Sequence, residues 1–386
     1  MDFNEKINRM NTASVKWELT EEIYGTDDVL PMWVADMDFR PPEELLDAIK
    51  SRVEHGIFGY TFVPPSVHEA ISSWLLGRHG WEIRDSWILF ANGVVPSISI
   101  AIAAFTNPGD RILIQPPVYT PFFELVELNG RMVENSPLTL AGGRYKIDFA
   151  SFEESLRKGC KLFLLCNPHN PGGMVWTEEE LGRMAELCIK YDCLVLADEI
   201  HSDIVLNGRR HIPIASLGKE IADRTITCIA PSKTFNLGGV QASAAIISNA
   251  ELREKFSAVQ KRHGFFAPNV FATTATEAAY RHGGIWLDSL IAYIEENVKI
   301  SKEFISENIP SIKLIEPEGT YLLWLDCRRL GLSDKAIQQL LIDKGKLALE
   351  PGEKYGPGGE GFVRMNIACP KEVLLDGLSR LKEALG

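Results

Sequence analysis

The sequence lacks the marks of several protein classes. It has no Cys-x-x-Cys pair, and its seven cysteines are scattered, with Cys166 and Cys193 inside apolar runs. An odd number of thiols in such runs fits reduced, buried cysteines better than disulfides. No run approaches the ~20 apolar residues of a membrane span, and the first residues, Met-Asp-Phe-Asn-Glu-Lys, form no apolar signal region. We therefore expect a cytoplasmic protein without a membrane partner.

Basic runs, internal repeats and low-complexity segments are also missing. The chain has 40 Lys and Arg against 52 Asp and Glu, a formal charge of −12, which argues against a nucleic-acid partner and favours solubility. With 386 residues, 45% hydrophobic and 24% charged, the composition is that of a globular protein long enough for two domains.

Apolar strands and amphipathic helices alternate along residues 46–284. Runs such as Leu162–Leu165 are continuously apolar, as in strands covered on both faces. Capping boxes at Ser66-Val-His-Glu69 and Thr177-Glu-Glu-Glu180 predict helix starts. The alternation predicts an α/β fold, a large doubly wound, mainly parallel sheet domain. Residues 285–386 predict a smaller α+β domain, joined by an N-terminal arm, residues 1–45.

One lysine stands at the end of a strand. The stretch Ile226–Gly239 runs from an apolar strand into a Pro-Ser-Lys turn and then a glycine-rich segment. Ligands of open α/β sheets bind at the carboxyl ends of strands. Lys233 is therefore a candidate anion contact, a candidate nucleophile of lowered pKa, or a solvated loop lysine.

Other strands bring further candidates to the same edge. The turn at Gly93 leads into a helix whose first N–H groups could bind an anion, although ordinary strand–helix turns look the same. Tyr119 is either a stacking platform or a half-buried tyrosine. Asn170 lies in an Asn-Pro loop that could be only a turn, and Asp198 could be only a helix cap.

Taken in order, these residues match one cofactor. A helix N-terminus can take a phosphate, a tyrosine can stack on a ring, and an asparagine can donate to a phenolate oxygen. An aspartate can pair with a protonated ring nitrogen, and a lysine can form an imine. The set predicts pyridoxal 5′-phosphate (PLP), which acts as an electron sink.

Three motifs resemble a known superfamily. Asn167-Pro-His-Asn-Pro-Gly172, Ala197-Asp-Glu-Ile-His201 and Ser232-Lys-Thr-Phe-Asn236, with Arg364 near the end, resemble the fold-type I PLP enzymes of the class I/II aminotransferases. Asp36-Met-Asp-Phe39 and a histidine at 201 are similar to the MalY/PatB-type cystathionine β-lyase (C–S lyase) branch.

The resemblance implies a role for each residue. Lys233 would carry the cofactor and move protons, Arg364 would bind the substrate carboxylate, and Asn170 would contact both cofactor and substrate. The remaining cofactor contacts would be Gly93, Val94, Val95, Tyr119, Asp198, His201 and Ser232, with Tyr60 reaching the phosphate of a neighbouring subunit; Lys233, Tyr119 and Tyr60 form the catalytic set, and no metal is expected. Gln241 stands where aminotransferases have an arginine, so the phosphate cup should carry less positive charge.

The resemblance implies a homodimer and leaves three functions open. The first is β-elimination from L-cystathionine or other cysteine S-conjugates, giving a thiol, pyruvate and ammonia. The second is transamination. The third is a PLP-binding protein whose main task is to bind a regulatory partner.

Overall fold

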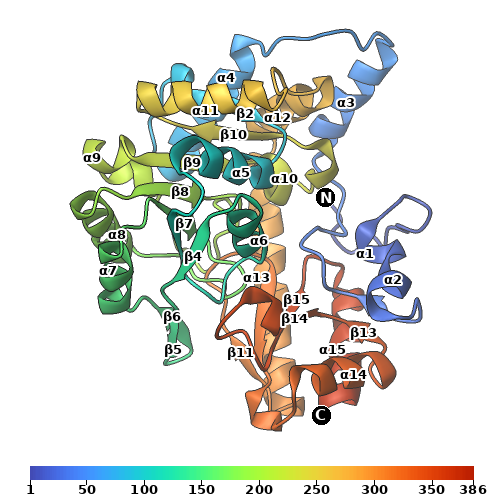
Figure 1. Cartoon of the computed structure of the whole chain (residues 1–386). Coiled ribbons are helices and arrows are strands. Elements are labelled where there is room, and N and C mark those ends of the chain that lie inside the picture. The colour runs from blue at the N-terminus through green and yellow to red at the C-terminus, as the bar shows by residue number, and fades with distance from the viewer.

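The computed structural model describes all 386 residues, and a seven-stranded sheet forms its centre (Figure 1). The strand order is β2-β10-β9-β8-β7-β3-β4, and every neighbouring pair is parallel except those that involve β10. The strands are β2 (Ile88–Ala91), β3 (Arg111–Ile114), β4 (Met132–Asn135), β7 (Leu162–Cys166), β8 (Leu194–Asp198), β9 (Thr225–Ile229) and β10 (Ser243–Ile246).

Helices cover both faces of this sheet. Alternate residues of β7 separate into two cores: Leu162 and Leu164 pack with α5, α6 and α11, whereas Phe163 and Leu165 pack with α7 and α8. This alternation is what a strand buried on both faces requires. The helices of this part are α3 (Glu43–Glu54), α4 (Pro65–His79), α5 (Val94–Phe105), α6 (Pro121–Leu128), α7 (Phe149–Arg157), α8 (Glu178–Lys190), α9 (Lys219–Ala222), α10 (Pro231–Thr234), α11 (Ala250–Arg262) and α12 (Val270–His282).

The sequence did not predict strand β10. Its residues, Ser-Ala-Ala-Ile, are small and give neither alternation nor a β-branched run. The strand nevertheless lies between β2 and β9, with Ala244 opposite Phe90 on one side and Ile229 on the other. After Lys233 the chain therefore runs back antiparallel to β9, and β10 joins β2 to the rest of the sheet beside the proposed site.

One of the two predicted capping boxes is wrong. Thr177 and Glu180 form theirs as expected at the start of α8. The other helix, α4, begins one residue before Ser66, at Pro65, and no side chain caps it. Proline is suited to the first turn of a helix because it has no N–H to satisfy.

The C-terminal part forms a second, antiparallel sheet in the order β11-β12-β15-β14. In its core, Trp324 of β12 stacks on Phe362 of β15 with centroids 4.9 Å apart and planes at 6°. Its elements are α13 (Gly284–Asn308), β11 (Lys313–Ile315), β12 (Leu322–Asp326), α14 (Asp334–Asp343), β13 (Leu347–Ala348), β14 (Glu350–Pro351), β15 (Phe362–Asn366) and α15 (Lys371–Leu385). Strands β5 (Thr139–Ala141) and β6 (Arg144–Lys146) form a separate antiparallel hairpin.

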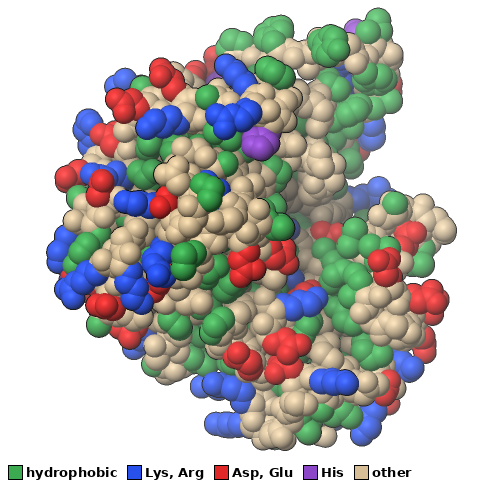
Figure 2. Space-filling model, viewed as in Figure 1, with side chains coloured by type: hydrophobic (Ala, Val, Ile, Leu, Met, Phe, Trp, Pro, Cys, Tyr) green, Lys and Arg blue, Asp and Glu red, His purple; other side chains and the backbone are tan.

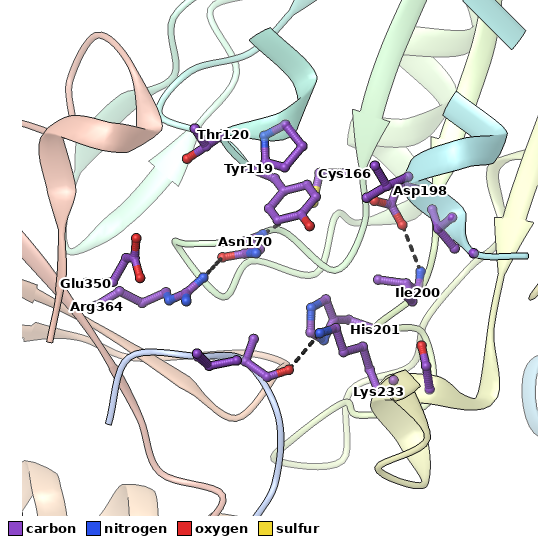
Figure 3. A pocket seen from close by; sticks show the side chains of 18 of the residues that line it. Tyr119, Thr120, Cys166, Asn170, Asp198, Ile200, His201, Lys233, Glu350 and Arg364 are labelled. Atoms are coloured by element: carbon purple, nitrogen blue, oxygen red, sulfur yellow. Dashed lines mark hydrogen bonds between the residues drawn. The ribbon is translucent and has the colours of Figure 1, made fainter. Parts of the chain in front are cut away.

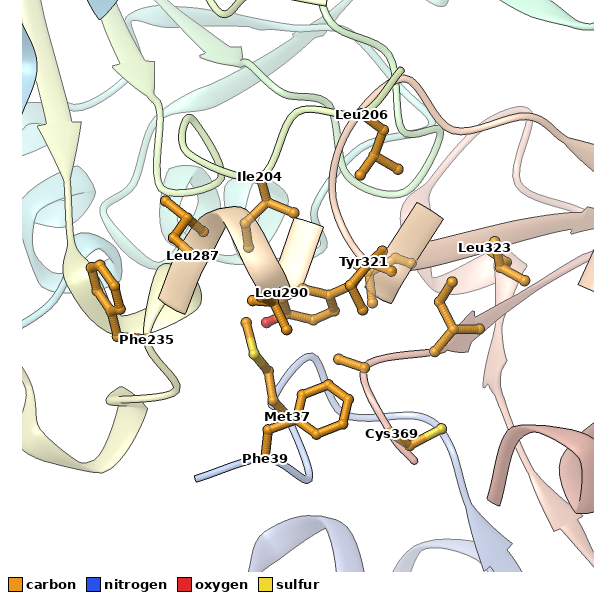
Figure 4. Close-up of a cluster of buried hydrophobic side chains, with 14 of the residues drawn as sticks. Met37, Phe39, Ile204, Leu206, Phe235, Leu287, Leu290, Tyr321, Leu323 and Cys369 are labelled. Carbon is orange, nitrogen blue, oxygen red and sulfur yellow. The ribbon is translucent and has the colours of Figure 1, made fainter. Parts of the chain in front are cut away.

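The N-terminal arm lies against this C-terminal part. Its helices α1 (Val15–Glu18) and α2 (Thr20–Tyr24) precede β1 (Leu30–Pro31), which pairs in parallel with β13. Further along the arm, Met37 and Phe39 pack in a buried cluster with Leu290 of α13 and Tyr321 (Figure 4). We propose the division predicted from sequence, with 46–284 as the large domain and 1–45 plus 285–386 as the small one. No helix is both long and apolar enough to cross a membrane.

Candidate active site

A cavity of about 480 Å³ lies where the two sheets and the N-terminal arm meet. Its walls come from the carboxyl ends of β7 and β8, the turn after β9, the start of α5, the arm, and strands β14 and β15 (Figure 3). Carboxyl ends of parallel strands are the usual ligand-binding edge of such sheets. Every sequence-predicted site residue except Tyr60 lines this cavity: Gly93, Val94, Val95, Tyr119, Asn170, Asp198, His201, Ser232, Lys233 and Arg364.

Lys233 lies on the short helix α10, directly after β9. Its Nζ donates a hydrogen bond of 2.6 Å to the carbonyl oxygen of Ala35 on the arm. Burial, and then the positive charge of Arg364, lower the pKa of the amine to about 8. A larger fraction of this amine is neutral at physiological pH than for a solvated lysine, which makes it a better base and nucleophile.

Asp198 ends strand β8 and is 4% exposed. One carboxylate oxygen accepts a hydrogen bond of 3.2 Å from the N–H of Ile200. Burial raises the pKa of this carboxyl group to about 7, although the Ile200 bond and the charge of Lys233 oppose the shift. The group lacks a close cation, so a cationic partner in the cavity would stabilise its ionised form.

Two ring side chains lie near these groups. Burial, and then the charges of Lys233 and Arg364, lower the pKa of His201 to about 3, so the imidazole stays neutral at physiological pH. Its buried Nδ1 has no hydrogen-bond partner. Tyr119 lies on the opposite wall, and burial, with the nearby charge of Asp198, raises its pKa to about 12. Both rings are therefore uncharged.

The start of α5 forms the anion-binding end of the cavity. Gly93 has φ +133°, a backbone conformation that L side chains rarely adopt, and its N–H donates to Ser243 Oγ at 2.9 Å. Val94 and Val95 follow in the first helical turn, whose N–H groups have no intrahelical acceptor. Gln241 is exposed and lies outside the cavity. Lys233 and Arg364 are the cavity's only cationic side chains, since its single histidine, His201, is neutral.

Arg364 projects from β15 and is 5% exposed. Its Nη1 donates to Asn170 Oδ1 at 3.1 Å, and its Nη2 donates to the carbonyl oxygen of Trp33 at 2.7 Å. Its buried Nε has no partner, and no carboxylate forms an ion pair with it. A buried guanidinium with spare donors is suited to an incoming carboxylate.

Tyr60 is not part of this cavity. It is fully exposed in the loop between α3 and α4, and its ring contacts none of the residues described above. The predicted role of Tyr60 toward a neighbouring subunit remains a prediction.

Sequence reasoning missed part of the cavity wall. Trp33, Val34 and Ala35 line it from the arm, and Glu350 and Tyr355 line it from the C-terminal part. No site residue was predicted in the arm. A residue that contributes only its backbone carbonyl to the wall, such as Ala35, cannot be recognised from its side chain. Glu350 has no sequence pattern that distinguishes it from a charged surface residue.

The comparisons with known proteins show the family of the chain. The family model described as "Aminotransferase class I and II" matches residues 27–381. The chain belongs to this family. It is 50% identical, over the full length of both chains, to cystathionine beta-lyase PatB of Bacillus subtilis (strain 168), and 34% identical to protein MalY of Escherichia coli (strain K12), over 100% of this chain and 98% of MalY.

A solved structure confirms the fold of this aminotransferase-family chain. Cystalysin of Treponema denticola, whose crystal structure contains a pyridoxal 5′-phosphate cofactor, is 37% identical and superposes with a TM-score of 0.97 over 100% of this chain and 98% of the other. The predicted fold-type I architecture and the resemblance to the MalY/PatB branch are thereby confirmed.

Proposed function

We propose that this chain is a PLP-dependent carbon–sulfur β-lyase, which cleaves L-cystathionine or related cysteine S-conjugates to a thiol, pyruvate and ammonia. The observation that carries the proposal is the full-length identity of 50% to cystathionine beta-lyase PatB, together with a cavity that holds the residues this chemistry needs.

The residues of the cavity fit the cofactor. The first turn of α5, which contains Val94 and Val95, would hold the phosphate of the cofactor. Ser232 of α10 would add its hydroxyl group to this contact. Asp198 would pair with its ring nitrogen, since this carboxylate is buried and has no cationic contact of its own. The unpartnered Nδ1 of His201 supports a polar contact there as well. Gly93 leaves room for the close backbone approach because it has no Cβ.

The chemistry divides between the cofactor and the chain. When bound, PLP supplies an electron sink for the pair released as the Cα–H bond of the substrate breaks. The neutral amine of Lys233 takes that proton, and Asp198 keeps a proton on the ring nitrogen. Arg364 binds the substrate α-carboxylate and thereby fixes which bond at Cα faces Lys233. The sulfur would then leave Cβ with the bonding pair and take up a proton to give the thiol, while a double bond forms between Cα and Cβ. Water would convert the remaining three-carbon unit to pyruvate and ammonia.

The decisive test is a product assay with the purified holoenzyme and L-cystathionine. We expect a free thiol, pyruvate and ammonia in equal amounts without any added keto acid. The alternative function is transamination, since the matching family model is described as aminotransferase class I and II. A strict requirement for a keto acid, with no thiol released, would replace the lyase proposal by the transaminase.

We propose a homodimer with its active sites at the interface. The loop around Tyr60 exposes apolar side chains, including Ile57, Phe58 and Phe62, which are 67%, 54% and 76% exposed. Figure 2 shows hydrophobic side chains gathered at this upper-right end of the molecule. A contiguous exposed apolar patch supports a protein contact. Sedimentation of the holoenzyme should give the mass of a dimer, and a monomer with full lyase activity would contradict the proposal.

A further inference from the structure

Four charged side chains line the cavity: Asp198, Lys233, Glu350 and Arg364. The proposed function uses three of them, for the ring nitrogen, the Cα proton and the substrate α-carboxylate. Glu350 has no part in that scheme. Its side chain is 13% exposed and lines the cavity, and a largely desolvated carboxylate needs cationic or hydrogen-bonding partners.

Glu350 lies beside Arg364 but is not paired with it. The two residues are opposite each other in the antiparallel pair β14–β15, so their side chains share one face of the sheet. The guanidinium turns instead to Asn170 and Trp33. Figure 3 shows Glu350 on the far side of Arg364 from Lys233. Because opposite residues of an antiparallel pair have Cβ atoms about 5 Å apart, Glu350 is within reach of the substituent of a substrate bound at Arg364.

The carboxylate retains capacity for a ligand. Glu350 Oε1 accepts a hydrogen bond of 2.9 Å from Lys354 Nζ, and Oε2 accepts none from the protein. The Lys354 side chain is 44% exposed, and such a surface pair contributes only about 0–1 kcal/mol. The Lys354 turn is fixed by Thr120, whose Oγ1 donates to the Lys354 carbonyl oxygen at 2.8 Å. The pair thus keeps Glu350 away from Arg364 while leaving one oxygen free.

We propose that Glu350 is the subsite for an ammonium group on the leaving thiol. The substrate class is then cysteine S-conjugates whose sulfur substituent carries an amine, and L-cystathionine is one of them because its leaving half is itself an amino acid. This inference rests on the lyase function proposed above. In this proposal Glu350 selects among cysteine S-conjugates by their sulfur substituent. Arg364 binds the α-carboxylate, which all of these substrates share.

The test uses two conjugates of nearly equal shape. S-(2-aminoethyl)-L-cysteine ends in an ammonium where S-propyl-L-cysteine ends in a methyl group. We expect the wild-type holoenzyme to favour the aminoethyl compound in kcat/KM by about tenfold, the order of a hydrogen bond to a charged group. Because 2-aminoethanethiol is a more acidic leaving group than propanethiol, part of the wild-type preference is independent of Glu350. Glu350→Gln should therefore lower this ratio severalfold, by slowing the aminoethyl compound and leaving the propyl compound unchanged.

A matched control is Glu353→Gln. Glu353 is exposed in the same turn and does not line the cavity, so its variant should keep the wild-type ratio. A wild-type ratio near one, or a ratio unchanged by Glu350→Gln, would overturn the subsite. Absence of thiol release from both compounds and from L-cystathionine would instead refute the lyase function.

Discussion

Replacing Lys233 with alanine should abolish turnover of L-cystathionine, with a loss of kcat of at least ~1000-fold, because one amine serves as both nucleophile and base. No other lysine lines the cavity, so nothing nearby can replace it. The measurement is pyruvate release at saturating substrate, with a visible absorption spectrum to follow the cofactor. The variant should also lose the spectrum of covalently held cofactor.

Lys344→Ala is the control for this variant. Lys344 is exposed, lies at the end of α14 and outside the cavity, and its side chain forms no hydrogen bond or ion pair. It should retain wild-type activity. Turnover by Lys233→Ala within tenfold of wild type would refute the roles given to this amine.

Asp198→Asn is expected to cost at least ~100-fold in kcat, since an amide cannot hold a proton on the ring nitrogen as an anion does. The same variant should gain relative stability in the cofactor-free protein. Burial raises the pKa of Asp198 to about 7, whereas an aspartate in an unfolded chain titrates near ~3.9. Between these values the folded state binds more protons at this position than the unfolded state.

The sign of the pH effect follows from that difference. Stability falls with rising pH wherever the folded state holds the extra proton, here from about pH 4 to about pH 7. Asp198→Asn removes this contribution. Urea unfolding of both cofactor-free proteins at pH 5 and pH 8 should therefore favour the variant more at pH 8. An equal difference at the two pH values would show that Asp198 is not held in a charge-excluding site.

The parts of the fold that the sequence predicted are those with unbroken patterns. The apolar runs at Leu162 and Cys193 became β7 and β8, with ends shifted by one residue. Strand β10 was missed because Ala-rich tetrapeptides fit many conformations, and only pairing with β2 and β9 fixes this one. At Ser66, the preceding prolines set the helix start, and the side-chain cap was not needed.

Some residues of the site could also be predicted from sequence patterns, and others could not. Tyr119, Asn170, Asp198 and Lys233 were predicted from position alone, because carboxyl ends of neighbouring strands share one edge. Arg364 came only from the resemblance, since it enters from a different sheet. The Ala35 carbonyl that accepts from Lys233 could not be predicted, because every residue offers the same carbonyl group and only the folded arm brings this one there.

The contacts of the arm also bear on how the protein is made. Asn236 holds the backbone of Met37 and Phe39 from one side, and Arg364 and Asn366 hold Trp33, Val34 and Asp36 from the other. A nascent chain still lacking β15 therefore leaves the arm without the hydrogen bonds from Arg364 and Asn366, and only Asn236 supplies the remaining ones of this set. Cofactor capture should therefore follow the synthesis of β15.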